Sequence, residues 1–474
     1  MTSTRNRTGW IVALTGIGSM MAALDTLVVS TALTTINADL HASVEQLEWT
    51  VNGYNLSFAV LLILGAGLGD RFGRRRMYTV GMVLFAAASA ACALAPNVGS
   101  LIAARVVQGA GAALVVPIGL ALLSAAFPAE KRGAAIGIFS AITGVSVAAG
   151  PLVGGAVVQG LAWQWIFWLN VPIGLIAAVL TMLRLPESHG PRSALDVRGL
   201  LLVTGGALGI VWGLVRGNSA GWTSAEVVAA LGGGVALAAG FIAWEARTAT
   251  PMVPLRLFRA RGFSAGNAAI FCTLASLFAA VFFLAQFMQA GLGHDPLAAG
   301  LRLLPWTATF ITVAPIAGAL ADRIGERPLM TTGLLLQAFG LTWLAVIAGP
   351  HVSYTSLLGP LVVAGVGVSL AIPAAQNSAV VSVADEDLGK AAGVNSLMRE
   401  LGGVFGIAVA VAVFAGAGHY GSPQSFTDGF GPAMVSAALF ALVGAGAAAL
   451  LPRRRSGSTP ALDPVPVLES EAVA

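Results

Sequence analysis

The feature that most constrains this chain is a charged motif that occurs twice in an otherwise apolar sequence. Residues 65–76 read G-A-G-L-G-D-R-F-G-R-R-R and residues 318–327 read G-A-L-A-D-R-I-G-E-R, so the D-R-x-G core returns 252 residues later. A group of small residues returns at a single offset of 256: Gly109, Gly111, Pro117, Gly133, Gly137 and Ser140 match Gly365, Gly367, Pro373, Gly389, Gly393 and Ser396. Such matches predict two copies of one unit in parallel, a design that transporters use with the binding site between the copies.

The composition indicates that most of the chain faces lipid. Of its 474 residues, 57% are hydrophobic and only 10% are charged, whereas soluble proteins carry roughly 25% charged residues. A helix needs about 20 mostly apolar residues to cross the hydrocarbon of a bilayer. Fourteen stretches of this kind follow one another, at residues 10–33, 49–69, 77–95, 99–126, 134–158, 165–184, 199–216, 225–244, 264–288, 298–320, 329–348, 355–382, 391–415 and 431–451.

The basic residues predict which side of the membrane each loop faces. With a cytoplasmic N-terminus, 21 of the 25 Lys and Arg residues fall on the cytoplasmic side, and the opposite loops hold Arg216 alone. Arg105, Arg302 and Arg399 lie within spans. Cytoplasmic loops are the ones that carry an excess of basic residues. The sequence therefore predicts a multi-pass protein of the cytoplasmic membrane with both termini in the cytoplasm.

The repeat divides the spans into an all-α membrane fold of two six-helix bundles with two extra central helices. Spans one to six and spans nine to fourteen are the two copies, and spans seven and eight have no counterpart. The predicted segments are a cytoplasmic tail, the N-terminal bundle, the inserted helices with their linkers, the C-terminal bundle and a polar, disordered cytoplasmic tail, at residues 1–9, 10–184, 185–263, 264–451 and 452–474. A polar, proline-rich tail cannot bury enough apolar surface to fold.

Charged residues within the spans are the first candidates for function, because they are costly in hydrocarbon. Asp25 in span one and Arg105 in span four both fall in the half of the membrane away from the cytoplasm, and Gln108 follows Arg105 on the same helix face. We expect Asp25 and Arg105 to form a proton-coupling pair. The alternatives are a structural hydrogen bond for Asp25 and backbone carbonyl contacts for Arg105.

Glu400 is a further candidate, near the middle of span thirteen and next to Arg399. Transporter sites lie near this depth. Because adjacent helix residues point about 100° apart, one of the two side chains can face a cavity while the other meets a neighbouring helix. Glu400 is predicted to be a second proton site or to bind a cationic substrate. The alternative is a packing pair between Arg399 and Glu400.

The two D-R-x-G motifs fall at helix ends on the cytoplasmic side. A carboxylate at such a position caps the next helix or binds an arginine across the bundle. This predicts a breakable latch at the inner gate, although the arginines also enforce topology. The residues of the predicted latch are Asp70, Arg71, Gly73, Arg74, Asp322, Arg323 and Gly325.

Glycine-rich segments in spans four and five predict close helix packing, since small residues let backbones approach. A proline within span five removes a helix hydrogen bond and kinks the helix. These packing residues are Gly109, Gly111, Gly150, Pro151, Gly154 and Gly155. Trp163, Trp165 and Trp168 are interpreted as an aromatic belt at the membrane interface.

Together these motifs resemble those of the major facilitator superfamily, in particular its 14-span drug:proton antiporters. The family's D-R-x-G-R-R loop stands at 70–75, R-x-x-Q-G-x-G-A at 105–112, G-P-x-x-G-G at 150–155, W-x-W-I-F-x-x-N-x-P-I-G at 163–174 and L-D-T at 24–26. The resemblance covers all fourteen spans and implies proton-driven export of toxic amphipathic compounds. Ala66 departs from the family's glycine, and Leu27, Ser30, Thr31 and Thr34 replace familiar residues of span one, which leaves the substrate open.

Other functions were weighed against export. A proton-coupled uptake symporter on the same fold is an alternative, and only the resemblance carried by Gly150 and Pro151 argues against it. A membrane enzyme should gather His, Asp or Glu at one face, but the five histidines are scattered in or near loops. A receptor would not need the repeat. Without a G-x-x-x-x-G-K-[ST] phosphate loop, ATP is not expected to be the driver. We expect no enzyme activity, cofactor, metal or nucleic-acid partner, and a functional monomer that handles protons and a small amphipathic molecule.

Overall fold

The computed structural model describes residues 2–127, 129–190, 196–249, 251–381, 383 and 387–452, and all regular structure within these ranges is helical. The predicted disordered tail lies outside the described residues, apart from Pro452. The helices are α1 (Thr2–Leu40), α2 (Val44–Phe72), α3 (Arg74–Ala93), α4 (Val98–Ala126), α5 (Ala129–Gly160), α6 (Trp165–Trp168), α7 (Asn170–Arg184), α8 (Val197–Ala220), α9 (Ala225–Glu245), η1 (Leu255–Arg259), α10 (Arg261–Gln286), η2 (Phe287–Gly291), α11 (Pro296–Arg302), α12 (Leu304–Ile324), α13 (Glu326–Ile347), α14 (Tyr354–Val381), α15 (Leu388–Ala417) and α16 (Pro423–Ala449).

The predicted membrane fold is confirmed. Within the described residues, 13 helical segments are long and apolar enough to cross a membrane, and α5, with 32 residues, occupies the place of the remaining predicted span. Two spans are interrupted near their starts. The sixth divides into α6 and α7, and the tenth into α11 and α12. Pro172 and Pro305 stand in the first turns of α7 and α12, and a proline has no N–H to continue the preceding helix.

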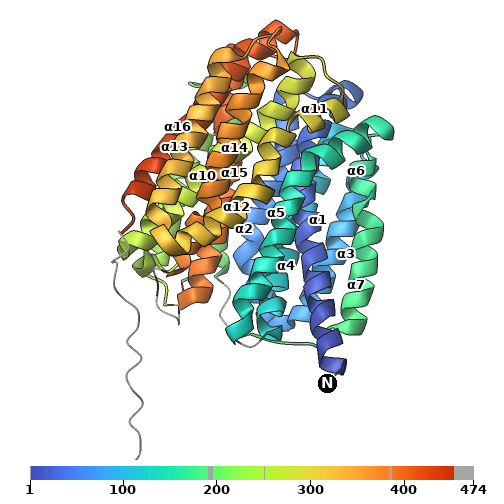
Figure 1. Ribbon diagram of the computed structural model, residues 1–474, viewed down its shortest axis with the longest axis vertical. Helices are drawn as coiled ribbons and strands as arrows, with labels where there is room; N and C mark the ends of the chain where they lie inside the picture. Colours follow the sequence, from blue (N-terminus) through green and yellow to red (C-terminus); the bar gives the residue numbers. More distant parts are fainter. Residues whose placement is uncertain are drawn as a thin grey trace, which may run out of the picture.

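The sequence repeat is also a repeat of packing. The N-terminal unit consists of α1–α7 and the C-terminal unit of α10–α16, and Figure 1 shows them side by side. A Cβ on Gly109 of α4 would lie 2.3 Å from the backbone oxygen of Tyr54 on α2. A Cβ on the matching Gly365 of α14 would lie 2.7 Å from the backbone oxygen of Trp306 on α12. Both positions therefore require glycine for the same reason, which is the close approach of two equivalent helices.

The inserted helices α8 and α9 pack against each other, and α8 also packs against the side of the molecule where α2 meets α15. Trp212 on α8 packs on Trp49 of α2, with ring centroids 5.7 Å apart. The side-chain amide of Asn218 on α8 donates to the carbonyl oxygen of Ala412 on α15 at 2.5 Å. The inserted pair thus contacts both units without belonging to either.

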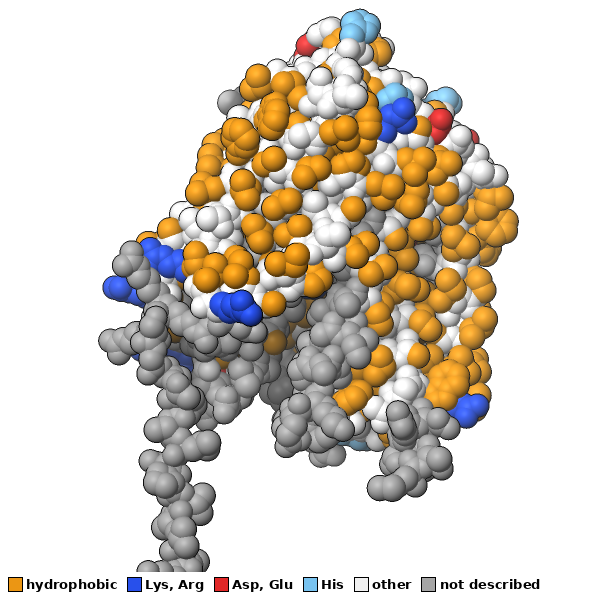
Figure 2. Space-filling view, viewed as in Figure 1, with side chains coloured by type: hydrophobic (Ala, Val, Ile, Leu, Met, Phe, Trp, Pro, Cys, Tyr) orange, Lys and Arg blue, Asp and Glu red, His pale blue; other side chains and the backbone are white. Residues whose placement is uncertain are grey.

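The surface has an apolar belt between two polar ends. Figure 2 shows hydrophobic atoms over the sides of the molecule, Lys and Arg mainly around the lower edge and histidines at the top. We call the lower end, with the turns at 71–76 and 323–327, the basic end. The opposite end, with the turns at 41–43, 161–164, 292–295 and 418–422, is the far end. This distribution is that of a protein whose sides face lipid.

Candidate functional site

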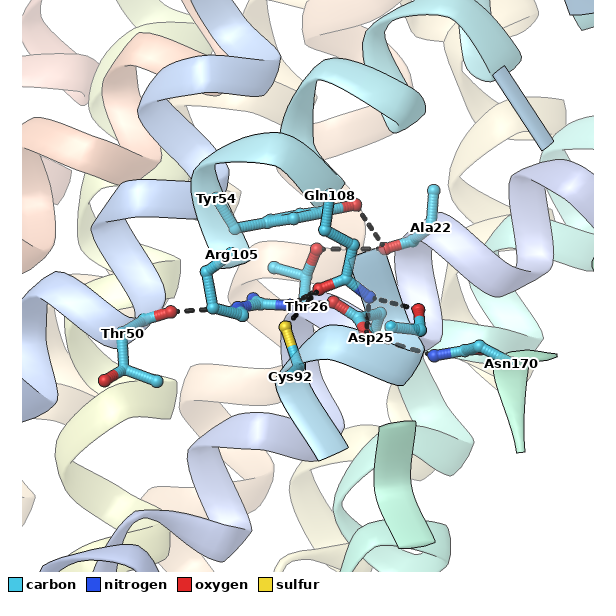
Figure 3. A network of polar contacts seen from close by, with 10 residues as sticks. Ala22, Asp25, Thr26, Thr50, Tyr54, Cys92, Arg105, Gln108 and Asn170 are labelled. Carbon is cyan, nitrogen blue, oxygen red and sulfur yellow. Dashed lines mark hydrogen bonds and ion pairs between the residues drawn. The ribbon is translucent and has the colours of Figure 1, made fainter. Parts of the chain in front are cut away.

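Asp25 lies at the centre of a buried polar network inside the N-terminal unit (Figure 3). Its side chain comes from the middle of α1, and the residue is 3% exposed. One carboxylate oxygen binds a guanidinium nitrogen of Arg105 in an ion pair. The other accepts from the side-chain amides of Gln108 at 2.9 Å and Asn170 at 3.1 Å. Both carboxylate oxygens therefore have hydrogen-bond donors within the unit.

Arg105 is held equally firmly on α4 and is fully buried. Its Nε donates to the backbone oxygen of Thr50 at 2.9 Å, and its Nη1 donates to the Gln108 side-chain oxygen at 2.6 Å as well as to Asp25. The guanidinium carbon lies 4.3 Å from the centroid of the Tyr54 ring, so that the cation also meets an aromatic face. The Nη2 atom has no hydrogen-bond partner.

Gln108 connects this pair to a third helix. Its amide nitrogen donates to Ser89 Oγ at 2.8 Å, and Cys92 Sγ on the same helix lies 3.7 Å from its side-chain oxygen. The network thus joins α1, α2, α3, α4 and α7 within one unit. The predicted Asp25–Arg105 pair is present with Gln108 beside it, while the role predicted for the pair remains a prediction.

Glu400 lies in α15, away from this network, and pairs with its neighbour. Arg399 Nη2 is 3.1 Å from Glu400 Oε1, and Arg399 Nε donates to the same oxygen at 3.1 Å. The Glu400 side chain is 12% exposed and that of Arg399 28%. This geometry matches the alternative of a packing pair between Arg399 and Glu400. The two side chains meet even though adjacent helix residues start out about 100° apart. This pairing leaves the second carboxylate oxygen of Glu400 outside the pair.

The first D-R-x-G motif forms the turn between α2 and α3 at the basic end. The Asp70 carboxylate pairs with Arg74, one turn later, at 2.7 Å. Gly73 and its counterpart Gly325 have φ values of 105° and 85°, a region that favours glycine. Arg71 and Arg323 end α2 and α12. The side chain of Asp322 lies outside the described part of the chain, so the two copies of the predicted latch cannot be compared there.

A segment that the sequence reasoning did not single out packs against this turn. The backbone N–H of Arg75 donates to Glu187 Oε1 at 2.9 Å, and that of Arg74 donates to the Ser188 oxygen at 2.8 Å. Glu187 also lies 3.7 Å from Arg75 Nε and 3.6 Å from Arg76 Nε. The chain after α7 thus holds the turn within its own unit.

The segment G-P-x-x-G-G of α5 lies against α1 and α11, at the far end. Gly150 and Gly154 face Leu27 and Thr31 of α1. A Cβ on Gly155 would lie 2.3 Å from the Pro296 oxygen, and one on Gly300 of α11 would lie 2.4 Å from the Pro151 oxygen. The two units therefore interlock here, backbone against backbone, and Figure 1 shows α5 beside α11.

Hydrogen bonds between the units occur at the same end. Thr34 on α1 donates to the side-chain oxygen of Gln289 in η2, and the Gln289 amide donates to the Thr31 oxygen at 3.0 Å. The backbone N–H of Leu297 donates to Gln159 Oε1 at 3.1 Å. These bonds and the glycine contacts close the far end of the molecule.

Several important residues were missed or misread from the sequence. Asn170 was noted only as part of a motif, yet it binds Asp25. Trp163 does not belong to an aromatic belt: it is 3% exposed and its indole N–H donates to Asp39 at 2.7 Å, whereas Trp165 is exposed. Glu48 was not considered, although it is fully buried in α2. Its signal was readable, because Glu48, Asn52 and Asn55 share one helix face in an apolar span.

Comparison with known proteins identifies the family. The sequence model of the Major Facilitator Superfamily matches residues 15–288 and 266–467, which together cover most of the chain. The chain belongs to the Major Facilitator Superfamily. It is therefore a multi-pass membrane transporter rather than an enzyme.

Among the relatives of this superfamily member are antibiotic and multidrug resistance proteins. The tetracenomycin C resistance and export protein of Streptomyces glaucescens is 36% identical over 396 residues, 83% of this chain and 73% of the relative. The multidrug resistance protein Stp of Mycobacterium tuberculosis is 36% identical over 413 residues, 86% of this chain and 76% of the relative. The cephamycin export protein CmcT of Amycolatopsis lactamdurans is 33% identical over 449 residues, 93% of this chain and 92% of the relative. These names agree with the predicted branch of the superfamily.

Solved transporters share the fold. The POT family transporter PepTSo superposes with a TM-score of 0.68 at 15% identity, covering 93% of this chain and 97% of PepTSo. A bacterial homologue of the human lysosomal transporter Spinster, in an inward-facing and occupied conformation, also gives a TM-score of 0.68 at 16% identity, covering 93% of this chain and 96% of the other. At this identity the likeness concerns the fold alone.

Proposed function

We propose that the protein is a proton-driven exporter of amphipathic drugs or antibiotics. It acts as a monomer in the cytoplasmic membrane, with both termini and the basic end in the cytoplasm. The resistance and export proteins among its relatives support the class of substrate and the direction of transport. The basic residues at one end support the orientation. The observation that carries proton coupling is the Asp25 carboxylate, buried and ion-paired within a transmembrane bundle.

The network gives protonation of Asp25 a mechanical consequence. An ionised Asp25 holds Arg105, Gln108 and Asn170, and so ties α1 to α4 and α7. A proton on the carboxylate removes its charge and weakens every bond that depends on it. Nine residues further along the same helix, roughly 13 Å at 1.5 Å per residue, Thr34 makes a cross-unit bond to Gln289. A shift of α1 after protonation therefore reaches the contact that closes the far end.

Two further roles belong to this proposal. Asp70 and Asp322 latch the inner gate, with Asp70 exchanging its Arg74 partner for one across the bundle when that gate closes. Glu400 recognises the cationic group of a substrate or carries a second proton through the carboxylate oxygen that Arg399 leaves outside the pair. Both roles are supported by position, near the basic end for the aspartates and mid-helix for Glu400.

The test of proton coupling uses Asp25→Asn in proteoliposomes. An amide keeps the shape of the carboxylate and one accepting oxygen for Gln108 and Asn170, but it carries no charge to pair with Arg105 and cannot bind a proton. We expect accumulation of a fluorescent amphipathic dye driven by a pH gradient to fall to background, while gradient-free exchange of dye across the membrane persists. Glu45→Gln, a change at a half-buried position of α2 that leaves Arg216 its second partner Glu226, is the matched control and should accumulate dye like the wild type.

Wild-type accumulation by Asp25→Asn at equal protein content would remove Asp25 from coupling. The same assay separates antiport from the alternative of uptake by symport, because the two move dye in opposite directions relative to protons. If Asp25→Asn loses both accumulation and exchange, a detergent titration of the purified variant decides whether the protein has unfolded.

A further inference from the structure

A second buried carboxylate, Glu48, lies in α2 close to the far end. It is four residues into the helix, about 6 Å along the axis, and fully buried. Asn52 donates its side-chain amide to Glu48 Oε1 at 3.0 Å, and Glu48 Oε2 has no partner. The side-chain oxygen of Asn52 and both polar atoms of Asn55 are likewise buried without a hydrogen bond. In the described part of the chain, this stripe of α2 gathers more unsatisfied polar atoms than any other single helix face.

The stripe points between the two units. On α2, Leu47 and Val51 pack in one buried cluster with Leu27 and Val28 of α1. Leu56 and Val60 pack in another cluster with Val394 and Leu397 of α15. At about 100° per residue, Glu48, Asn52 and Asn55 project between these two directions. They therefore point between α1 of the N-terminal unit and α15 of the C-terminal unit, both of which pack against α2.

No described cation compensates Glu48. On α4, Arg105 is bound to Asp25, and on α1 the acids Asp25 and Asp39 are bound to Arg105 and Trp163. The arginine of α8 that lies nearest the far end, Arg216, pairs with Glu45 and Glu226. Of the other charged groups on the packed helices, Arg399 and Glu400 pair with each other, and Lys390 is exposed near the start of α15. The rest belong to helix segments near the opposite, basic end: Arg5 and Arg7 of α1, Asp70 and Arg71 of α2, Arg74, Arg75 and Arg76 of α3, and Arg198 of α8.

A carboxylate in such a place is stable as a neutral acid rather than as an anion. The free-energy cost of removing an ionised group from water is offset only by a close cation or by several hydrogen-bond donors. Asn52 supplies a single donor to Glu48. A protonated Glu48 has an O–H of its own to donate, and the unsatisfied oxygen of Asn52 and amide oxygen of Asn55 offer acceptors on the same face. Protonation thus removes the charge and supplies the donor that this stripe lacks.

We propose that Glu48 is a proton-binding site that the closing of the far end completes. When the units separate at this end, Glu48 meets water and ionises. When they close, it takes one proton from the water on that side, and hydronium becomes water as the carboxylate becomes a carboxylic acid. This rests on the proposed function in one respect, namely that the far end opens and closes during transport. It adds a proton site distinct from Asp25, whose charge is balanced in the closed structure.

The sign of the pH dependence follows. The closed far end binds the proton more tightly than the open one, so low pH favours closure and closure is lost as pH rises. One linked proton changes the ratio of closed to open molecules by at most about tenfold per pH unit.

The experiment measures that ratio with spin labels at both sides of the far end. Leu161 of the N-terminal unit and His419 of the C-terminal unit are exposed there, and the native Cys92 and Cys272 are buried. With cysteines at positions 161 and 419, we expect the short-distance population to shrink as pH rises in the otherwise wild-type protein. Glu48→Gln should hold the short distance across the whole pH range. Glu45→Gln, about one turn away at a half-buried position whose partner Arg216 also binds Glu226, should behave like the wild type.

Glu48→Asp tests whether the effect of Glu48→Gln comes from the loss of an ionisable group. It retains an ionisable group, so it should recover a pH-dependent distance with a displaced midpoint. A wild-type distance that does not change with pH, or a Glu48→Gln protein with the same pH dependence as the wild type, would overturn the proposal. Either result leaves proton coupling through Asp25 intact, whereas wild-type dye accumulation by Asp25→Asn would overturn the proposed function without touching Glu48.

Discussion

The interiors of the two units differ at positions that the repeat makes equivalent. Arg105 and Gln108 of α4 correspond, at the offset of 256, to Leu361 and Ala364 of α14, and all four are almost completely buried. The adjacent glycines make the same close helix contacts in both units. One fold thus accepts a charged and a polar side chain at these positions in one copy and apolar side chains in the other.

This difference separates what the fold requires from what function requires. A buried ion pair seldom stabilises a protein more than apolar residues of similar size would, and the C-terminal unit shows that apolar residues fit this place. Its interior is instead held by rings, such as Phe287 and Phe430 stacked at 4.2 Å between centroids. The charges of the N-terminal unit are therefore hard to explain by packing alone, which supports a role in coupling.

The largest expected loss of stability comes from replacing one polar residue of the N-terminal unit by its apolar counterpart in the C-terminal unit. Arg105→Leu places there the residue found at 361, but it strands the Asp25 carboxylate in the bundle. Loss of one partner of a buried pair costs about 3–5 kcal/mol. We expect a corresponding fall in the free energy of unfolding, measured by detergent titration of the purified protein in mixed micelles.

The matched control removes the stranded charge as well. In Asp25→Asn/Arg105→Leu the new amide still has Gln108 and Asn170 as partners, so the double variant should be more stable than Arg105→Leu alone. Additive losses would mean that Arg105 stabilises the unit through Thr50 and Tyr54 rather than through Asp25. Transport should be lost in both variants. The double variant regains stability, but it has no ionisable group at position 25 with which to couple transport to protons.

A smaller loss of stability is expected at the glycines, where the two units make the same close helix contacts. Gly109→Ala and Gly365→Ala each place a methyl group against the backbone of a neighbouring helix, 2.3 Å from the Tyr54 oxygen and 2.7 Å from the Trp306 oxygen. Overpacking of this kind costs about 1–3 kcal/mol. We expect both variants to lose stability to a similar extent in the same titration. As a control, Gly446→Ala adds a methyl group with nothing within 4 Å and should be neutral or slightly stabilising. A clear loss in only one unit would show that the packing repeat is not energetically symmetric.

The same contrast explains how far the sequence could be interpreted. The spans, the repeat and the Asp25–Arg105 pair were predictable, because apolar length, fixed offsets and rare charges are properties of the chain itself. The partners of a side chain are set by the tertiary fold and could not be predicted in the same way. Trp163 was assigned to the membrane interface because its type is common there, but the fold turns it inward to Asp39. Asp70 was expected either to cap the next helix or to bind an arginine across the bundle, and in this structure it binds Arg74 in the first turn of the next helix. Glu48 was overlooked because it stands near a span boundary, where an acid is ordinarily solvated.

The last comparison is between two buried glutamines, one in each unit, and its smallest effect is expected in the C-terminal unit. Gln108 binds Asp25, Arg105 and Ser89, whereas Gln337 on α13 has one bond, to Ser276 at 2.9 Å, and an unpaired oxygen. Gln108→Leu leaves three buried groups short of a partner, two of them charged, and hydrogen bonds to charged groups are each worth about 1.5–3 kcal/mol. Gln337→Leu removes one neutral bond together with its own unsatisfied oxygen, so its net cost should be about 1 kcal/mol or less.

Stability and transport should separate these two variants. Both are measured by the detergent titration and by dye accumulation driven by a pH gradient. We expect Gln108→Leu to lose stability and accumulation together, since it loosens the carboxylate that the proposed mechanism uses. Gln337→Leu should keep near wild-type values for both, because its bond holds two helices of an apolar interior and touches no charge. Equal losses from the two substitutions would remove the distinction between a unit that couples and a unit that only packs, and coupling would then have to be sought at the boundary between the units, where Glu48 and Glu400 lie.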